Sequence, residues 1–310
     1  LNTSVSFAMA RPFFFLARLF KIPTYAVRIF LLSLIGGYPV GAKLLTAEVK
    51  RGNLSKRTAA RMLCFCTNCS PSFLITGVGT ILFHNAAIGF LLFGCETLSC
   101  CLIAFLSRFF SKESKPTNSS FQKANLPFSR VFVDSVTSST VTMAGICAFV
   151  VFFSAVLPVL FLFLDQMGIP KPLCGCIGGL LEVSNGCSLL TDQLFRDPLA
   201  AAALFTSFGG VCVLFQIALL LKGTQISIKP LLFSRFFHCA ISVGLLVVLK
   251  PFVITGDLAV FGLSLNEIPK TSASSPIAFF LLILLAVMLL FFTVKPATMK
   301  LSRKKRKSAS

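Results

Sequence analysis

The sequence has no tryptophan and only 10 acidic residues among its 310, against 29 lysines and arginines. Charged residues make up 13% of the chain, about half the share of a typical soluble domain. The chain is 55% hydrophobic, and a soluble fold of this length could not bury so much apolar surface. A membrane protein can expose that surface, because lipid covers it. Because the usual tryptophan belt is absent, we expect the 35 phenylalanines to face lipid. These features predict a polytopic α-helical membrane protein.

Motifs for catalysis and metal binding are also missing. There is no phosphate-binding loop of the form GxxxxGK[ST], and neither His84 nor His238 has a nucleophile and an acid beside it, so we expect no enzyme. The histidines are far apart and Cys174 and Cys176 form only a C-x-C pair, so we expect no metal site and no cofactor. The other cysteines lie mostly in apolar runs, which favours buried thiols over disulfides. Basic residues cluster between apolar runs, which is typical of cytoplasmic loops, so no nucleic-acid partner is predicted.

Six apolar segments are long enough to cross a bilayer, since about 20 helical residues span its ~30 Å core. Four are uninterrupted and the last two are broken by polar or glycine residues: 87–107, 144–164, 232–249, 276–294, 59–83 and 199–221. The predicted fold is all-α, with about six transmembrane helices and two re-entrant helical hairpins.

The first hairpin is predicted in 22–49, because Gly-Gly-x-Pro divides it into arms too short to cross. The second is predicted in 173–191. As a full span that segment would bury Glu182 in lipid, and it would place the basic residues up to Arg235 outside the cell. Residues 11–30 carry four basic residues and are predicted to form a helix on the cytoplasmic face, or a helix buried by partners.

The order hairpin, broken span, span occurs twice, in 22–107 and 173–249. Basic loops place the start of the first copy inside and that of the second outside, which predicts an inverted-topology repeat. The chain begins at Leu1 without an initiator Met or a signal peptide, and span 144–164 has no counterpart before the first copy, so we expect the natural N-terminus to lie upstream. The predicted organisation is a basic interfacial helix in 1–21, a first repeat in 22–110, a cytoplasmic linker in 111–130, a second repeat in 131–250, an outer loop and last span in 251–294, and a basic cytoplasmic tail in 295–310.

Four helix breaks at membrane depth form the predicted substrate site: Gly36–Gly41, Asn68–Pro71, Glu182–Gly186 and Ser207–Gly210. Unpaired backbone groups are tolerated at that depth only where protein or a water-filled cavity receives them, and exposed helix ends attract ions. The candidate substrate-binding residues are Gly37, Tyr38, Pro39, Gly41, Lys43, Asn68, Ser70, Glu182, Ser184, Asn185, Gly186, Ser207, Gly209, Gly210 and Gln216.

The ionisable candidates each leave two interpretations open. Lys43 either pairs with an anionic substrate or with Glu182, or extends to the cytoplasmic interface. Glu182 either binds a coupling cation, H⁺ or Na⁺, or a substrate hydroxyl or amine, or else caps a hairpin helix. Glu96 is a second candidate for proton coupling or an interhelical contact.

The amide candidates are open in the same way. Asn68 and Asn185 either bind substrate or end a broken helix, and Gln216 bonds to a ligand or to a neighbouring helix.

Four motifs, in this order, resemble the sporulation integral membrane protein YlbJ (SpoVV) family. Residues 36–44 resemble its GYPxGAK segment, and 61–73 resemble its helix that ends in a cysteine, asparagines and SGP, with Cys69 and Ser70 in place of the usual serine and glycine. Residues 179–187 resemble its GLLE-x-[ST]-NG motif, and 207–210 with Gln216 resemble its SFGG…Q motif. The resemblance covers about residues 10–250.

The resemblance implies membership of the nucleoside-recognition (Gate) superfamily, which includes nucleoside transporters and the membrane part of FeoB iron transporters. It implies a role in endospore formation: transport of dipicolinate, a small aromatic dianion, across the outer forespore membrane. We therefore expect a small-molecule substrate and the lipid bilayer as partners, with homo-oligomerisation left open. The alternatives are a nucleoside or nucleobase transporter and a non-transporting membrane scaffold or receptor.

Overall fold

The computed structural model describes residues 10–110, 128–192 and 194–253, and every regular element among them is a helix. Two compact units divide the chain. The first holds the described residues before 111 and after 148; the described part of the second, 128–148, is the beginning of the long helix α7 (Phe128–Gln166). The predicted last span 276–294 and the basic tail lie outside the described residues.

Four helices in the described part are long and apolar enough to cross a membrane: Ala86–Phe110, Phe132–Gln166, Pro198–Leu221 and Lys229–Val253. The bent pair Arg11–Phe20 and Thr24–Gly36 adds a fifth if it forms one span. The predicted all-α membrane protein is therefore confirmed, and these four helices contain the predicted spans 87–107, 144–164, 199–221 and 232–249. The total of six spans and the inverted orientation stay predictions.

The predicted single basic helix over 11–30 is wrong. The 3₁₀ turn η1 (Arg11–Phe13) and α2 (Phe15–Phe20) end at Lys21, which has a left-handed φ of 48°. The chain then bends by 115° and continues through η2 (Thr24–Ala26) into α3 (Val27–Gly36). Arg28 is buried, and its Nε donates to the Tyr25 carbonyl oxygen at 3.3 Å. The bend brings the Phe20 and Phe30 rings edge to face, at 5.6 Å between centroids, which buries apolar area that one straight helix would expose.

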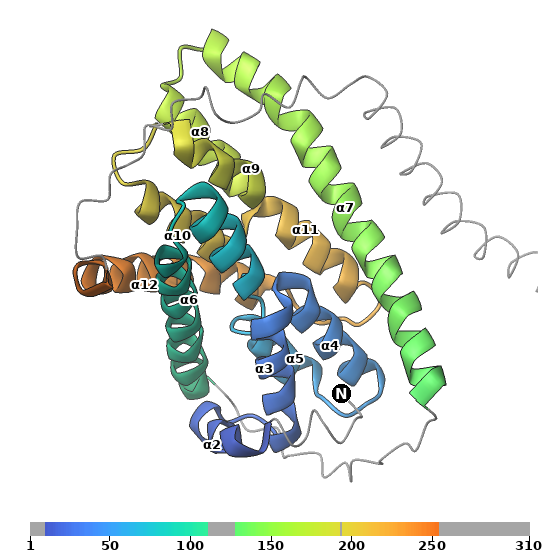
Figure 1. The fold of residues 1–310 in the computed structure, drawn as a ribbon. Helices are drawn as coiled ribbons and strands as arrows, with labels where there is room; N and C mark the ends of the chain where they lie inside the picture. Colours follow the sequence, from blue (N-terminus) through green and yellow to red (C-terminus); the bar gives the residue numbers. More distant parts are fainter. Residues whose placement is uncertain (1–9, 111–127, 193, 254–310) are drawn as a thin grey trace, which may run out of the picture. The chain divides into compact units, whose positions relative to one another are not determined.

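The order hairpin, broken helix, straight helix occurs twice in the first unit (Figure 1). The first set is α3 and α4 (Tyr38–Lys50), α5 (Lys56–Leu63) with the π-helix η3 (Ser72–Leu82), and α6 (Ala86–Ser107), which η4 (Arg108–Phe110) extends. The second set is α8 (Lys171–Leu181), α9 (Val183–Ser188) and η5 (Leu189–Asp192), then α10 (Pro198–Phe208) with α11 (Gly210–Leu221), and α12 (Lys229–Val253). The two sets pack together through α6 with α12 and through α4 with α11.

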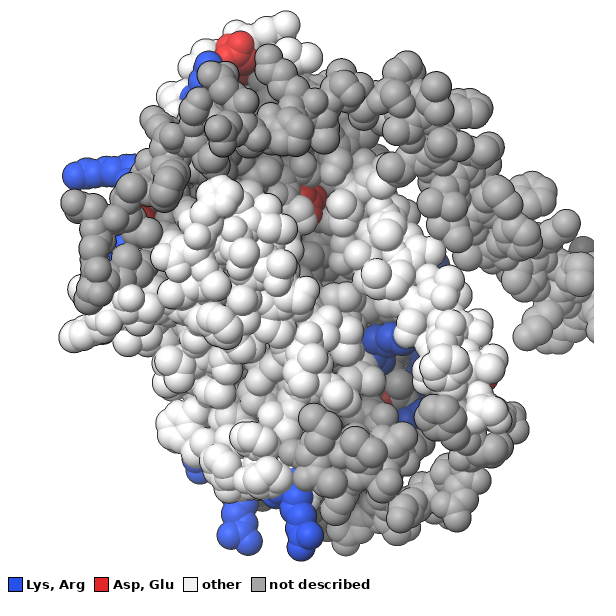
Figure 2. All heavy atoms as spheres, viewed as in Figure 1, with Lys and Arg blue, Asp and Glu red and all other residues white. Residues whose placement is uncertain are grey.

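Hydrogen bonds hold the basic loops of the first unit together at one end. We call this region, which contains Lys21, Lys56, Arg61 and Gln225, the basic end. Lys56 Nζ donates to Gln225 Oε1 at 2.5 Å, which joins the start of α5 to the loop before α12. Arg61 donates to the Lys21 carbonyl oxygen at 2.5 Å and to Ser107 Oγ at 3.3 Å, which joins the end of α2 to the end of α6. Figure 2 shows Lys and Arg side chains standing out in small groups against a surface that is otherwise largely uncharged.

The opposite end of α12 is tied to α10 by Asp197, which lies just before a candidate span. Its Oδ1 accepts from the amides of Leu199 and Ala200 at 3.1 and 3.2 Å and so caps α10, while Oδ2 accepts from Lys250 Nζ at 3.1 Å. Partial burial raises the pKa of Asp197, but the hydrogen bond from Lys250 and those from the two amides outweigh it, so the pKa lies below its usual value.

We expect Asp197→Ala to lower the free energy of unfolding by about 1 kcal/mol, the usual cost of a lost N-cap. Asp197→Asn keeps an oxygen acceptor for the cap and should lose less. Because the folded-state pKa is depressed, the contribution of Asp197 is present above its unfolded pKa and disappears as the pH falls through the lower folded value. Thermal unfolding followed by circular dichroism at pH 7 and pH 3 measures this; an equal effect of Asp197→Ala at both pH values would contradict it.

Candidate functional site

All four predicted helix breaks are present, and three of them are only one residue wide. Gly37 separates α3 from α4, Glu182 separates α8 from α9, and Gly209 separates α10 from α11. Gly37 and Gly209 have φ values of 83° and 81°, a region that a side chain disfavours. The second break is wider than predicted, because residues 64–71 separate α5 from η3.

The four breaks meet one another in space. A Cβ on Gly37 would lie 3.2 Å from Ser70 Cβ, which places the first break against the second. The Tyr38 hydroxyl donates to the Thr206 carbonyl oxygen, and a Cβ on Gly209 would lie 3.1 Å from the Tyr38 ring, which places the first against the fourth. A Cβ on Gly210 would lie 3.1 Å from the Leu181 carbonyl oxygen, so the fourth adjoins the third.

A buried carboxylate, that of Glu96 in α6, joins the second break to the fourth. Glu96 is 1% exposed. Its Oε2 accepts a hydrogen bond from Ser207 Oγ at 2.9 Å, and its Oε1 lies 3.4 Å from the Cys69 amide nitrogen, which donates to it. Glu96 therefore makes the interhelical contact that was one of its two interpretations. Its carboxylate also places a titratable group beside the site.

Arg235 of α12 binds the backbone oxygens that the same two breaks expose. Its guanidinium is buried, with Nη1 donating to the Ser207 carbonyl oxygen at 3.0 Å and Nη2 to the Thr67 carbonyl oxygen at 2.5 Å. Nη2 also donates to the Thr67 hydroxyl. Carbonyl groups at the end of a helix have no intrahelical partner and carry partial negative charge, so a cation is well suited to them.

His238, one turn after Arg235, is completely buried and continues this network. Its Nδ1 lies 3.2 Å from Arg235 Nη1, and because arginine can only donate, Nδ1 is the acceptor and the proton is on Nε2. Nε2 lies 3.4 Å from Cys100 Sγ and 3.7 Å from Glu96 Oε2. Cys100 in turn donates to Asn68 Oδ1 at 2.8 Å, so this imidazole connects α12 to α6 and to the second break.

At the third break, Glu182 caps α9 and is 1% exposed. Its carboxylate accepts from the amides of Ser184 and Asn185 at 3.1 and 2.7 Å, and from Asn185 Nδ2 at 2.9 Å. Asn185 Nδ2 also donates to Ser154 Oγ of α7 at 2.8 Å. Glu182 therefore caps a helix, which was one of its two interpretations. The Asn185 side chain beside it is partly exposed.

The other candidate residues divide into packing positions and residues away from the breaks. Gly41 and Gly186 are packing positions, because a Cβ on either would lie within 2.1 Å of a backbone atom. Gln216 is buried in α11, and its amide lies 3.3 Å from Cys212 Sγ of the same helix, not at a break. Lys43 is a partly exposed residue of α4, six residues after Gly37 at the first break.

Two more candidates lie at helix starts. Pro39 is the second residue of α4, where the missing amide costs nothing, and Ser184 is exposed in the first turn of α9.

Two residues of the network were not predicted. From the sequence, Arg235 counts only as a basic residue that sets the cytoplasmic side, whereas α12 buries it, and His238 is weighed only as a metal ligand or a catalytic histidine. Their spacing of three residues inside an apolar run places both on one helix face. Ionisable residues within a candidate span are costly unless they face a partner, and this cost is the signal that could have identified both residues.

Comparison with known proteins finds one similarity. The chain is 25% identical over 265 residues to the sporulation integral membrane protein YlbJ of Bacillus subtilis (strain 168), an alignment that covers 72% of this chain and 64% of that protein. The chain thus spans less than two thirds of the length of this relative. No protein-family profile matches the chain. No solved structure matches it. The similarity supports the resemblance to the YlbJ family, and this relative is, by its name, an integral membrane protein of sporulation.

Proposed function

We propose that this chain transports a small organic anion across a membrane of a sporulating cell and is not an enzyme. The observation that carries the proposal is the meeting of four helix breaks, two of which are joined by a buried polar network. Backbone N–H and C=O groups that a broken helix leaves unpaired at membrane depth have to bond to protein, water or a substrate. A non-transporting scaffold has no need to keep such groups there. Transporters of the inverted-repeat kind place their sites at such discontinuous helices.

The ends of the broken helices favour an anion. Helices α4 and α11 both begin at a break without a capping side chain, so the positive end of each helix dipole lies at a break without a side-chain acceptor. Dipicolinate, with two carboxylates on a small aromatic ring, is the favoured substrate, and the outer forespore membrane is the proposed location. Glu182 opposes a dianion, so we propose that H⁺ or Na⁺ neutralises it during transport.

A nucleoside is the second candidate, and Glu182 with Asn185 favours it. A buried carboxylate beside an amide, with Glu182 Oε2 and Asn185 Nδ2 2.9 Å apart, suits the hydroxyls of a ribose and the edge of a base.

The proposal of transport includes an orientation. The positive-inside rule places the basic end in the cytoplasm.

The test is uptake of labelled dipicolinate and labelled uridine into proteoliposomes that contain the purified protein. We expect dipicolinate uptake, and we expect Glu182→Gln to reduce it tenfold or more, since a hydrogen bond to a charged group contributes about 1.5–3 kcal/mol. The matched control is Asp165→Asn, which removes an exposed carboxylate at the end of α7, and it should leave uptake unchanged.

The outcomes separate the candidates. Uridine uptake without dipicolinate uptake moves the protein to the nucleoside class. Absence of both, from a protein whose circular dichroism shows it to be folded, contradicts transport and favours a scaffold. Dependence of uptake on an imposed pH or Na⁺ gradient identifies the coupling ion.

A further inference from the structure

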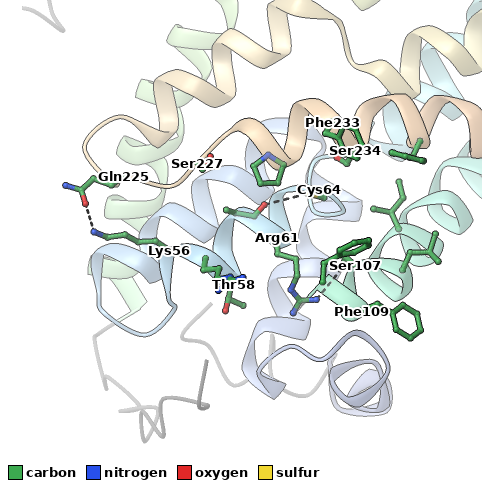
Figure 3. Close-up of a pocket in the computed structure, with 17 residues that line it drawn as sticks. Lys56, Thr58, Arg61, Cys64, Ser107, Phe109, Gln225, Ser227, Phe233 and Ser234 are labelled. Atoms are coloured by element: carbon green, nitrogen blue, oxygen red, sulfur yellow. Dashed lines mark hydrogen bonds between the residues drawn. The ribbon is translucent and has the colours of Figure 1, made fainter. Parts of the chain in front are cut away.

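A pocket of about 890 Å³ lies at the basic end of the first unit and touches the helix breaks only at Cys64, the first residue of the second break. Its walls come from α5, the last turns of α6 with η4, and the beginning of α12. In Figure 3, Lys56 and Gln225 lie on one side, Phe233 and Phe109 lie on the other, and Arg61 and Ser107 lie between them. The pocket is therefore polar and basic on one side and aromatic on the other.

The charge of this pocket is all of one sign. Lys56, Arg57 and Arg61 line it, and no acidic residue in the described part of the chain does. Lys56 donates to a neutral amide and Arg61 to backbone carbonyl oxygens and a hydroxyl, while Arg57 is exposed. None of the ion pairs among the described residues includes any of the three. Three cations thus face one cavity, and no described residue brings an opposite charge to balance them.

The apolar side belongs to two helices that are long enough to cross a membrane. Ile103 and Leu106 lie in the last turns of the candidate span Ala86–Phe110, and Phe233 and Phe237 in the first turns of Lys229–Val253. These four residues therefore lie near the ends of their spans, at the depth where lipid acyl chains meet headgroups. The basic residues lie beside them, where a headgroup phosphate would be.

We propose that this pocket binds one anionic phospholipid, with its phosphate at Lys56 and Arg57 and an acyl chain along Phe233 and Phe237. The proposal does not depend on what the protein transports. Ser234 and Cys64 also line the pocket, next in sequence to Arg235 and to the buried Phe65. A bound lipid would therefore brace α5 against α12 beside the buried network.

Charge also argues against the basic segments of this chain as the occupant. The stretch 303–307 consists only of arginine and lysine, and 111–130 carries four basic residues and one glutamate. Both would bring more positive charge to three unbalanced cations. An anionic headgroup gains about 1 kcal/mol of attraction per nearby lysine or arginine, which corresponds to about fivefold in affinity.

Native mass spectrometry of the purified full chain, incubated with equal amounts of phosphatidylglycerol and phosphatidylcholine, tests the proposal. We expect phosphatidylglycerol to remain bound in clear excess. The double variant Lys56→Gln/Arg57→Gln should weaken its binding by about tenfold or more. The matched control Lys50→Gln/Lys222→Gln removes two exposed basic residues that do not line the pocket, and it should bind as the unchanged protein does.

Every other outcome overturns the proposal. Equal retention of both lipids means that the headgroup charge is not recognised. An equal loss in the two double variants means that the whole basic end attracts anionic lipid without a site. If inorganic phosphate at millimolar concentration displaces phosphatidylglycerol fully, the acyl chain contributes nothing and the pocket is only an anion site. All four substituted residues are exposed, so circular dichroism should show the variants to be folded.

Discussion

A Gly41→Ala variant is expected to lose about 3 kcal/mol of stability, at the upper end of the usual cost of overpacking. The Cβ of this alanine would lie 1.6 Å from the Cys66 carbonyl oxygen, which is a backbone atom and cannot rotate away. The first hairpin would have to move off the second break, so substrate transport should be lost together with stability. Helix propensity acts in the opposite direction, because alanine is favoured over glycine within a helix by about 1 kcal/mol.

Gly94→Ala is the matched control for this prediction. Gly94 is also helical, in α6, and a Cβ there would meet nothing within 4 Å. We therefore expect Gly94→Ala to melt at or above the temperature of the unchanged protein. A thiol-reactive dye measures both melting temperatures, since eight of the twelve cysteines are free and buried and become reactive on unfolding. Equal melting temperatures for Gly41→Ala and Gly94→Ala would contradict the close contact.

The positions of the helix breaks could be predicted because their causes are local. Glycine and proline at Gly37 and Pro39, and glycine at Gly209, interrupt apolar runs where nothing else disturbs helical periodicity. The same local signal predicted the two-fold order of elements, which the helices of the first unit follow. Element order is a property of consecutive residues, so one sequence is enough to predict it.

The contacts between breaks could not be predicted, because they join residues far apart in the chain. Nothing near Tyr38 in the sequence indicates that its hydroxyl bonds to Thr206, 168 residues later. The π-helical winding of η3 is also absent from the apolar pattern. It coincides with a close approach to α6, where a Cβ on Gly89 would lie 2.5 Å from Ile75 Cα. That approach depends on tertiary packing more than on local preference.

Arg235 shows why charge placement alone misleads. The positive-inside rule counts basic residues by their position between apolar runs, and Arg235 lies close enough to such a boundary to be counted as a loop residue. In the folded chain its guanidinium instead donates hydrogen bonds to carbonyl oxygens of the second and fourth breaks. A cation is retained there because two helix ends need it, and the sequence does not show which carbonyls α12 will face.

Arg235→Met is expected to destabilise the protein by about 3–5 kcal/mol, the usual cost of removing one member of a buried charged network. The methionine fills similar volume but leaves the Ser207 and Thr67 carbonyl oxygens without a donor. Arg235→Lys should recover only part of the loss, because one ammonium group cannot reproduce the planar fork that reaches both breaks. Arg18→Met, at an exposed position of α2, is the control and should change the melting temperature little.

A double-mutant cycle with Glu96→Gln decides whether Arg235 also balances the buried carboxylate. Ser207 joins the two, since its hydroxyl donates to Glu96 and its carbonyl oxygen accepts from Arg235. In the Arg235→Met background an ionised Glu96 has no cation bound to its network, so Glu96→Gln should cost about 1–3 kcal/mol less there than in the unchanged protein. Additive costs would mean that the two residues act separately and that Arg235 serves only the helix ends. A favourable coupling would make the carboxylate, the guanidinium and the two breaks one unit, which a substrate moving through the site would have to rearrange together.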